Sequence, residues 1–390
     1  MRSIRVIPEI EMPGHALGLL CGYPQYSCNG GPFKPRCKWG VEADIICAGN
    51  DEAISFLEDV LDEVMNIFPS VYIHCGGDEC PRTRWQTCPK CQERMKDEGL
   101  QNEDQLQACL TRHFAKYLES KGRRLVGWNE ILKGDLEFTE SAVVMSWLGD
   151  AEKAAKLGHN VVMTPNGYLY FTWQQFYAKE LFEYVGGYVT AHTIYFYNPL
   201  KNIPENLTSK IIGVQGSIWT EYIWERTDLQ WKTFPRALAL AEIAWLPNER
   251  KDWVRFMHEA MVLSNMGLVD AGLQYGTQGV WNKGELQADK WVSVTFPLDQ
   301  ALDKNGNIEA AFIHKNGKNK THVKNVKLLF NDAVVAEDDH EGVAADEYKD
   351  VIYALKNSAT VTPDNIKIQA GMMCEGGDDC EGTIYLYMNR

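Results

Sequence analysis

The 390-residue sequence has no hydrophobic run long enough to cross a membrane. A spanning helix needs about 20 consecutive apolar residues, and the most apolar stretch, residues 237–246, is interrupted by Glu242. Runs of Lys and Arg are also missing, and the formal net charge is −14. This acidic balance argues against nucleic acid and anionic membrane surfaces as partners. We therefore expect a globular protein without a membrane span.

Neither a phosphate-binding loop nor a signal peptide is found in the sequence. No Gly-rich loop follows any expected strand, so a nucleotide-binding function has no support. The apolar residues 4–7 begin almost directly after the start and lead into a motif instead of a cleavage site. The chain is therefore expected either to be cytosolic or to begin inside a longer secreted protein.

The cysteines favour the second of these expectations. There are eleven, and pairs of them bracket two short loops, at residues 28–37 and 374–380. Both loops predict a disulfide and hence an extracytoplasmic location, periplasmic or secreted. The CPKC motif at residues 88–91 is an alternative metal or redox pair. A closed zinc site needs four ligands, and no second CxxC motif is present, so we expect neither a metal nor a cofactor.

Short apolar runs alternate with helical spacing through the N-terminal two thirds of the chain. This alternation predicts a parallel sheet with helical crossovers. Polar and aromatic residues follow the strands, as they do where a barrel keeps its chemistry, although a doubly wound sheet fits the pattern too. The expected strands are 4–9, 71–75, 125–128, 143–147, 161–163 and 211–215, and the expected helices are 51–68, 105–118, 151–157 and 232–245.

The pattern changes at about residue 291 to an alternation of period two. Turn-forming Asn, Gly and Asp separate these alternating runs, which is typical of a small all-β sandwich. We therefore predict a catalytic α/β domain at 1–285 and a β-sandwich domain at 291–390, with 272–288 as the linker.

Two adjacent carboxylates follow one of the expected strands, in the sequence Gly76-Gly77-Asp78-Glu79. The glycines let the backbone leave the strand and approach a ligand closely. Neighbouring carboxylates in a partly dry site do not both ionise easily, so the pKa of one is expected to rise, as a general acid requires. A surface turn is the alternative, as is the similar GGDE motif of diguanylate cyclases, for which the surroundings are wrong.

Four motifs together resemble glycoside hydrolase family 20, the β-N-acetylhexosaminidases, and in particular its Bacteroides-type bacterial members. They are VIPEIEMPGHA at 6–16, HCGGDE at 74–79, GWNE at 127–130 and GSIWTE at 216–221. The resemblance implies a (β/α)8 TIM-type barrel and removal of terminal, non-reducing β-linked N-acetylhexosamine from glycans. It also implies retaining, substrate-assisted catalysis through an oxazolinium ion, a known exception to the two-carboxylate scheme.

The resemblance implies a role for each matching residue. Glu79 matches the general acid/base, Asp78 matches the residue that binds the acetamido N–H, and Tyr170 matches the one that holds the acetamido oxygen. The other matching residues are implied to line the sugar pocket (Trp128, Trp147, Trp219, Glu221 and Thr172) or to support the acid (His15, His74 and Glu130).

Two departures from the family pattern set further expectations. The family barrel has two βα units before the motif at 6–16, so we expect a truncated barrel that is poorly stable and weakly active or inactive. Thr172 stands where the family usually has Asp, which suggests tolerance of a 6-O-sulfated sugar. A lacto-N-biosidase-like enzyme and a non-catalytic carbohydrate-binding remnant are the alternative functions.

Overall fold

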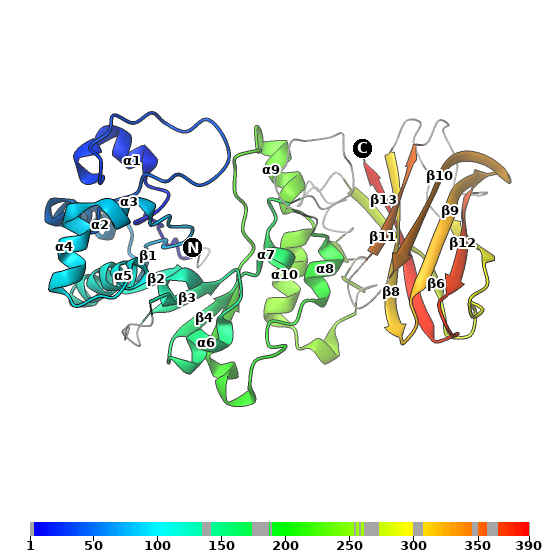
Figure 1. The fold of residues 1–390 in the computed structure, drawn as a ribbon. Helices are drawn as coiled ribbons and strands as arrows, with labels where there is room; N and C mark the ends of the chain where they lie inside the picture. The colour runs from blue at the N-terminus through cyan, green and yellow to red at the C-terminus, as the bar shows by residue number, and fades with distance from the viewer. Residues whose placement is uncertain are drawn as a thin grey trace. The chain divides into compact units, whose positions relative to one another are not determined.

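The computed structural model describes residues 4–134, 142–173, 187, 189–252, 255–256, 259–260, 273–298, 307–344, 350–356 and 366–389. The chain forms two compact units. Unit 1 comprises Met1–Asn166 and Pro199–Gln215, and unit 2 comprises Gly167–Asn198 and Gly216–Arg390. Figure 1 traces the chain from the parallel strands of unit 1 to the antiparallel strands that end unit 2.

Unit 1 is built on a parallel sheet whose five strands follow the order of the chain. All four residues of the central strand are buried, as expected for a parallel sheet that is covered on both faces. Five of the six expected strands are thereby confirmed. They are β1 (Tyr72–His74), β2 (Arg124–Trp128), β3 (Val143–Ser146), β4 (Asn160–Met163) and β5 (Ile211–Val214).

The sixth expected strand, at residues 4–9, is not formed as a strand. Only Glu9 makes an isolated parallel bridge, to His74 of β1. The His74 N–H donates to the Pro8 carbonyl at 2.9 Å, but Pro8 has no N–H of its own with which to extend the ladder. The apolar Ile4 is accordingly 77% exposed instead of packed in the sheet.

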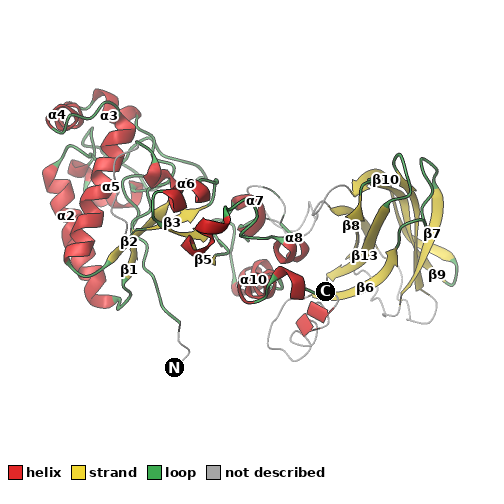
Figure 2. Cartoon of the chain, turned by 90° about the horizontal axis from the view of Figure 1, so that it is seen from below, coloured by secondary structure: helices red, strands yellow, loops and turns green. Residues whose placement is uncertain are grey.

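Three expected helices of unit 1 are confirmed as α2 (Asp51–Ile67), α5 (Glu103–Ser120) and α6 (Ala151–Lys156). The side chain of Asn50 caps α2 by accepting the Glu52 N–H at 3.2 Å. Figure 2 shows α2 and α5 beside β1 and β2. The shorter helical segments are α1 (Leu17–Gly22), η1 (Pro24–Tyr26), α3 (Thr83–Thr87), α4 (Pro89–Asp97), η2 (Asn129–Leu132) and η3 (Glu205–Lys210).

The helix expected at 232–245 is two helices. One ends at Thr233, and the next begins at Arg236, because Pro235 lacks the N–H that a continuous helix would need there. None of the helices in the described ranges combines the length and apolar character required to span a membrane. Besides η3, the helical segments between residues 166 and 250 are α7 (Asn166–Leu169), α8 (Ala191–Phe196), α9 (Arg226–Thr233), α10 (Arg236–Trp245) and η4 (Asn248–Arg250).

The C-terminal strands form two four-stranded antiparallel sheets, ordered β10-β9-β12-β7 and β11-β8-β13-β6. Both contribute to one core that contains Phe296, Phe312 and Ile368. The linker expected at 272–288 is wrong in part, because its first half forms a strand of the second sheet. The strands are β6 (Leu273–Trp281), β7 (Val292–Leu298), β8 (Asn307–Gly317), β9 (Thr321–Phe330), β10 (Ala333–Ala344), β11 (Asp350–Lys356), β12 (Ile366–Cys374) and β13 (Cys380–Asn389).

One of the two expected disulfides is present. Cys374 and Cys380, at facing ends of β12 and β13, are bonded. The pair expected between Cys28 and Cys37 is not: Cys37 is exposed and unbonded, and the Cys28 sulfur lies 3.8 Å from that of Cys91.

Candidate active site

The carboxylate pair follows directly on β1, at a turn that requires glycine. Gly76 and Gly77 have φ angles of +65° and +97°, which a side chain disfavours. A Cβ atom at Gly76 would also lie 2.1 Å from the Glu11 Oε2 atom. From α5, the Gln107 side chain donates to the Gly77 carbonyl at 2.6 Å and fixes the turn from outside. The two glycines and Gln107 thereby fix the turn that carries Asp78 and Glu79.

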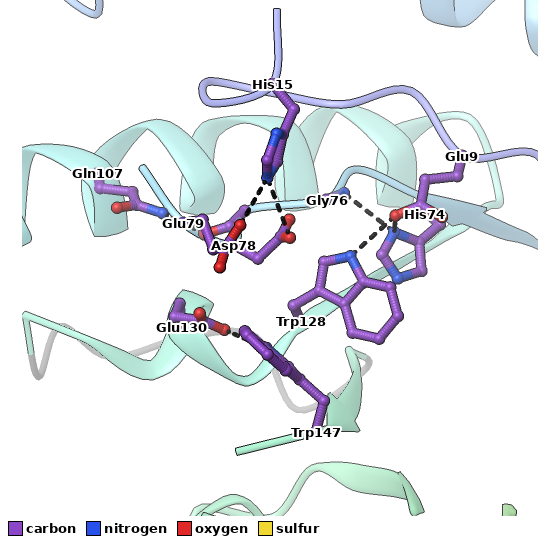
Figure 3. A network of polar contacts seen from close by, with 11 residues as sticks. Glu9, His15, His74, Gly76, Asp78, Glu79, Gln107, Trp128, Glu130 and Trp147 are labelled. Atoms are coloured by element: carbon purple, nitrogen blue, oxygen red, sulfur yellow. Dashed lines mark hydrogen bonds and ion pairs between the residues drawn. The ribbon is translucent and has the colours of Figure 1, made fainter. Parts of the chain in front are cut away.

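His15 connects the two carboxylates (Figure 3). Its Nε2 atom lies 3.5 Å from Asp78 Oδ2 and 3.3 Å from Glu79 Oε2. The Asp78 side chain is 13% exposed and that of Glu79 is 42% exposed. The hydrogen bond to Asp78 raises the pKa of His15 even though burial opposes this. His15 therefore lies between a mostly buried carboxylate and a more accessible one.

Glu11 is a third carboxyl of this cluster, for which the sequence had suggested no role. Burial, followed by the charge of Asp78, raises the pKa of Glu11 to about 11, so this group is protonated at neutral pH. The Glu11 carboxyl is within hydrogen-bonding range of both Glu9 and Asp78. Glu11 Oε2 and Asp78 Oδ1 are both buried, and neither has a hydrogen-bond partner within the described residues. A proton carried by Glu11 supplies the donor that these oxygens need.

Trp128 and His74 lie beneath the carboxylates and contact Glu9. The Trp128 indole N–H donates to Glu9 Oε1 at 2.9 Å, and its ring meets His74 edge-on at 5.1 Å. Burial lowers the pKa of His74, so the ring is neutral. Its Nδ1 atom lies 3.0 Å from the Gly76 nitrogen, whose N–H it can accept, and 3.1 Å from Glu9 Oε1. Trp128 is only 2% exposed, which places it in the packing beneath the site.

Glu130 and Trp147 form a second acid–indole pair in the same unit. The Trp147 indole N–H donates to Glu130 Oε2 at 2.9 Å, as Figure 3 shows. Burial raises the pKa of Glu130, although this hydrogen bond opposes the shift. Asn129 accepts the backbone N–H of Trp147 at 3.2 Å and thereby fixes the start of the loop after β3. Trp147 itself is half-buried.

The remaining residues that the sequence singled out belong to unit 2. Tyr170 forms a parallel bridge with Ser217 and meets the Trp219 ring edge-on at 6.4 Å. The Thr172 hydroxyl accepts the Trp219 backbone N–H at 2.8 Å and is buried. Glu221 is exposed. The fold thus places the segment of Tyr170 and Thr172 beside the segment of Trp219.

Protonated His15 should stabilise the fold in acid. Because its pKa is raised in the folded state, its contribution is complete below the unfolded value of about 6.5 and is lost as the pH rises through the folded pKa. His15→Gln should therefore lower the unfolding free energy in acidic solution but not in alkaline solution. Urea titrations across this range test it, with exposed His113→Gln as the control. A deficit that stays constant with pH would contradict the charge-based explanation.

Glu11→Gln should stabilise the folded chain at neutral pH. A carboxyl held protonated costs stability wherever the unfolded chain would ionise it, which is above about pH 4.5. Gln keeps the neutral shape and removes this cost, so the gain should shrink as the pH falls toward 4.5. Unfolding titrations at both pH values measure it, with exposed Glu119→Gln as the control. An equal change in the unfolding free energy at both values would show that folding does not shift the pKa of Glu11.

The α/β region matches known proteins. The family model for the glycosyl hydrolase family 20 catalytic domain matches residues 1–248. A β-hexosaminidase of Porphyromonas gingivalis is 45% identical over 259 residues, which are 65% of this chain and 33% of that protein. A β-hexosaminidase of Akkermansia muciniphila is 30% identical over 261 residues, covering 65% of this chain and 52% of that protein.

Solved structures agree with these matches. A β-N-acetylhexosaminidase from Bacteroides fragilis superposes with a TM-score of 0.59 at 30% identity, over 70% of this chain and 54% of its own. An exo-β-N-acetylglucosaminidase from Vibrio harveyi, solved in complex with N-acetylglucosamine, gives 0.59 at 27% identity, over 69% and 43%. This chain therefore spans between a third and about half of the length of these relatives. With more than half of its residues matched by the family model, the chain belongs to glycosyl hydrolase family 20.

Proposed function

We propose that this protein is an exo-acting β-N-acetylhexosaminidase that removes terminal, non-reducing N-acetylglucosamine or N-acetylgalactosamine from glycans. The observation that carries the proposal is the pair Asp78 and Glu79 with His15 between them, in a family 20 catalytic domain. A lacto-N-biosidase-like activity uses the same groups with a wider pocket and is the alternative.

Glu79 is proposed as the general acid, because its carboxyl is the accessible member of the pair. It protonates the glycosidic oxygen while the substrate's acetamido oxygen attacks the anomeric carbon and displaces the leaving group. The resulting oxazolinium ion is opened by water, from which the Glu79 carboxylate then takes a proton, so the anomeric configuration is retained.

Asp78 is proposed to bind the acetamido N–H and to stabilise the positive charge that develops on the ring. A buried carboxylate suits this task, because an ion pair is stronger where water is excluded. Neutral Glu11 supports Asp78 by donating a hydrogen bond that keeps the Asp78 charge available. Protonated His15 offsets the negative charge of both partners.

The other residues are proposed to hold the sugar. Trp147, Trp219 and Glu221 would supply aromatic walls and an acceptor for sugar hydroxyls, and Tyr170 would donate to the acetamido oxygen. Trp128 and Thr172 are proposed to support neighbouring residues of the site, since Trp128 is hydrogen bonded to Glu9 and Thr172 to the Trp219 backbone.

We also propose that the parallel sheet of unit 1 belongs to an eight-stranded β/α barrel. The family 20 catalytic domain has a TIM-barrel-type fold, and the parallel strand order agrees with that architecture.

An extracytoplasmic location is proposed from the bonded pair Cys374–Cys380, because disulfides persist in oxidising compartments.

Glu79→Gln should reduce hydrolysis of p-nitrophenyl N-acetyl-β-D-glucosaminide by about 10²–10⁴-fold, the usual contribution of a general acid or base. Glu119→Gln, an exposed change on α5, should leave the rate unchanged. The anomer released first, followed by NMR, should be β. Failure of wild-type protein to hydrolyse this substrate while still binding N-acetylglucosamine would favour a carbohydrate-binding remnant instead.

Tolerance of a 6-O-sulfated substrate remains a second proposal, and it rests on residue 172. Lys232 and Arg236 are buried cations that donate to carbonyls at residues 171–173, which favours an anionic substituent near this turn. Thr172→Asp should lower the ratio of sulfated to unsulfated turnover, whereas Thr172→Asn should not. An unchanged ratio in Thr172→Asp would remove this proposal and leave the hexosaminidase proposal intact.

A further inference from the structure

Four cysteines from distant parts of the chain meet in unit 1. The Sγ atom of Cys47 lies 3.6 Å from that of Cys91 and 3.7 Å from that of Cys88, and the Sγ atoms of Cys28 and Cys91 are 3.8 Å apart. All four sulfurs lie within 4.8 Å of one another. Cys47, Cys88 and Cys91 are buried and Cys28 is partly buried. We call this set the four-cysteine cluster.

Local structure brings the cluster together in two pairs. An isolated antiparallel bridge between Ser27 and Ile46 places Cys28 and Cys47, the residues that follow each of them, diagonally on the same face. The second pair is the CPKC motif at the start of α4, where Cys88 is the N-cap and Cys91 lies in the first turn. The sequence therefore does contain a second pair of ligands, although not as a second CxxC motif.

A glycine lets the two pairs approach. A Cβ atom at Gly49 would lie 2.2 Å from the Lys90 carbonyl and 2.5 Å from the Cys91 nitrogen, so only glycine allows this backbone contact. The Gly49 N–H is also hydrogen bonded to the sulfurs of Cys47 and Cys91. Backbone N–H groups that point at sulfur are what a site for thiolates requires.

The sulfur separations match a tetrahedral site. Zinc bonds thiolate sulfur at about 2.3 Å, which gives a tetrahedron with edges of about 3.8 Å. The separations of 3.6 Å (Cys47–Cys91), 3.7 Å (Cys47–Cys88) and 3.8 Å (Cys28–Cys91) agree with this edge. Four thiols, three of them buried, that meet with no covalent pairing among them also need a reason to stay together, and a shared cation supplies one.

We propose that the four-cysteine cluster binds one structural Zn²⁺ ion. Four thiolates complete a tetrahedral shell and leave no position for water or substrate, so the ion holds the fold and takes no part in catalysis. Zinc suits this donor set because it is borderline soft and takes tetrahedral thiolate coordination readily. The N-terminus of α4, where two ligands lie, favours the negative charge of the complex.

The proposed ion braces the two loops that carry the candidate acid and its histidine. Ile46, next to Cys47, donates its N–H to the Pro13 carbonyl at 3.0 Å, two residues before His15. The Trp85 indole N–H donates to the Ile46 carbonyl at 3.0 Å, and Trp85 lies on the segment between Glu79 and Cys88. One ion therefore fixes the loop of His15 to the loop of Glu79.

Metal analysis of the full chain, purified without chelator or added metal, tests the proposal. Inductively coupled plasma mass spectrometry should find one zinc ion per chain in wild-type protein and in Cys37→Ser. Cys37 is the matched control, because it is an exposed cysteine between Cys28 and Cys47 that lies outside the cluster. Cys47→Ser and Cys91→Ser should lose most of the zinc, and Co²⁺ exchanged into wild-type protein should give the intense bands of tetrahedral thiolate coordination.

A strong chelator should lower the Tm of wild-type protein and of Cys37→Ser, and zinc alone should restore it. Wild-type protein with no zinc and four alkylatable cluster thiols would overturn the proposal. So would zinc-free protein whose intact mass and peptide map show disulfides within the cluster, or protein that contains iron instead. The wild-type measurements decide the matter even if a cysteine variant does not fold, and they do not depend on hexosaminidase activity.

Discussion

The structure of the candidate site in unit 1 depends on the close packing of several carboxyl groups. Burial, followed by the nearby charges of Asp78 and Glu9, raises the pKa of Glu11, and like charges repel strongly where water is excluded. A proton on Glu11 relieves part of this repulsion, and the contacts of His15 with Asp78 and Glu79 favour the charged form of the imidazole. The turn at Gly76 follows from the same constraint, because any side chain there would displace Glu11.

The hydrogen-bond donors around this cluster preserve its negative charge. Glu9 and Glu130 each accept an indole N–H, from Trp128 and Trp147 respectively. An indole is a neutral donor, so it provides a hydrogen bond to a carboxyl group without the full charge neutralisation that an arginine would bring. Tryptophans at these strand ends therefore have an electrostatic task in the structure, in addition to any contact with a sugar ring.

Much of this arrangement was predictable from local pattern, and the exceptions have physical causes. Short apolar runs located β1 to β5, and the GGDE turn located Asp78 and Glu79, because both signals lie in adjacent residues. Pro8 ended the expected first strand by removing a ladder donor. Strand β10 carries only a weak alternation, because its acidic sequence, EDDHEG at 337–342, lies in an edge strand with mostly exposed side chains.

Spatial relations between distant segments were the part that sequence patterns did not reach. The protonation of Glu11 depends on Asp78, 67 positions later in the chain. The four-cysteine cluster likewise joins Cys28 and Cys47 to a CxxC motif that lies 41 to 63 positions later, so a search for two CxxC motifs misses it. Both depend on the same backbone contacts: Ile10 and Met12 bond to the end of β1, and Ile46 bonds to Pro13. The segment from Glu9 to Cys47 therefore brings Glu11 and His15 to the acid pair. A zinc ion bound by the four-cysteine cluster at the end of this segment would hold that geometry in place.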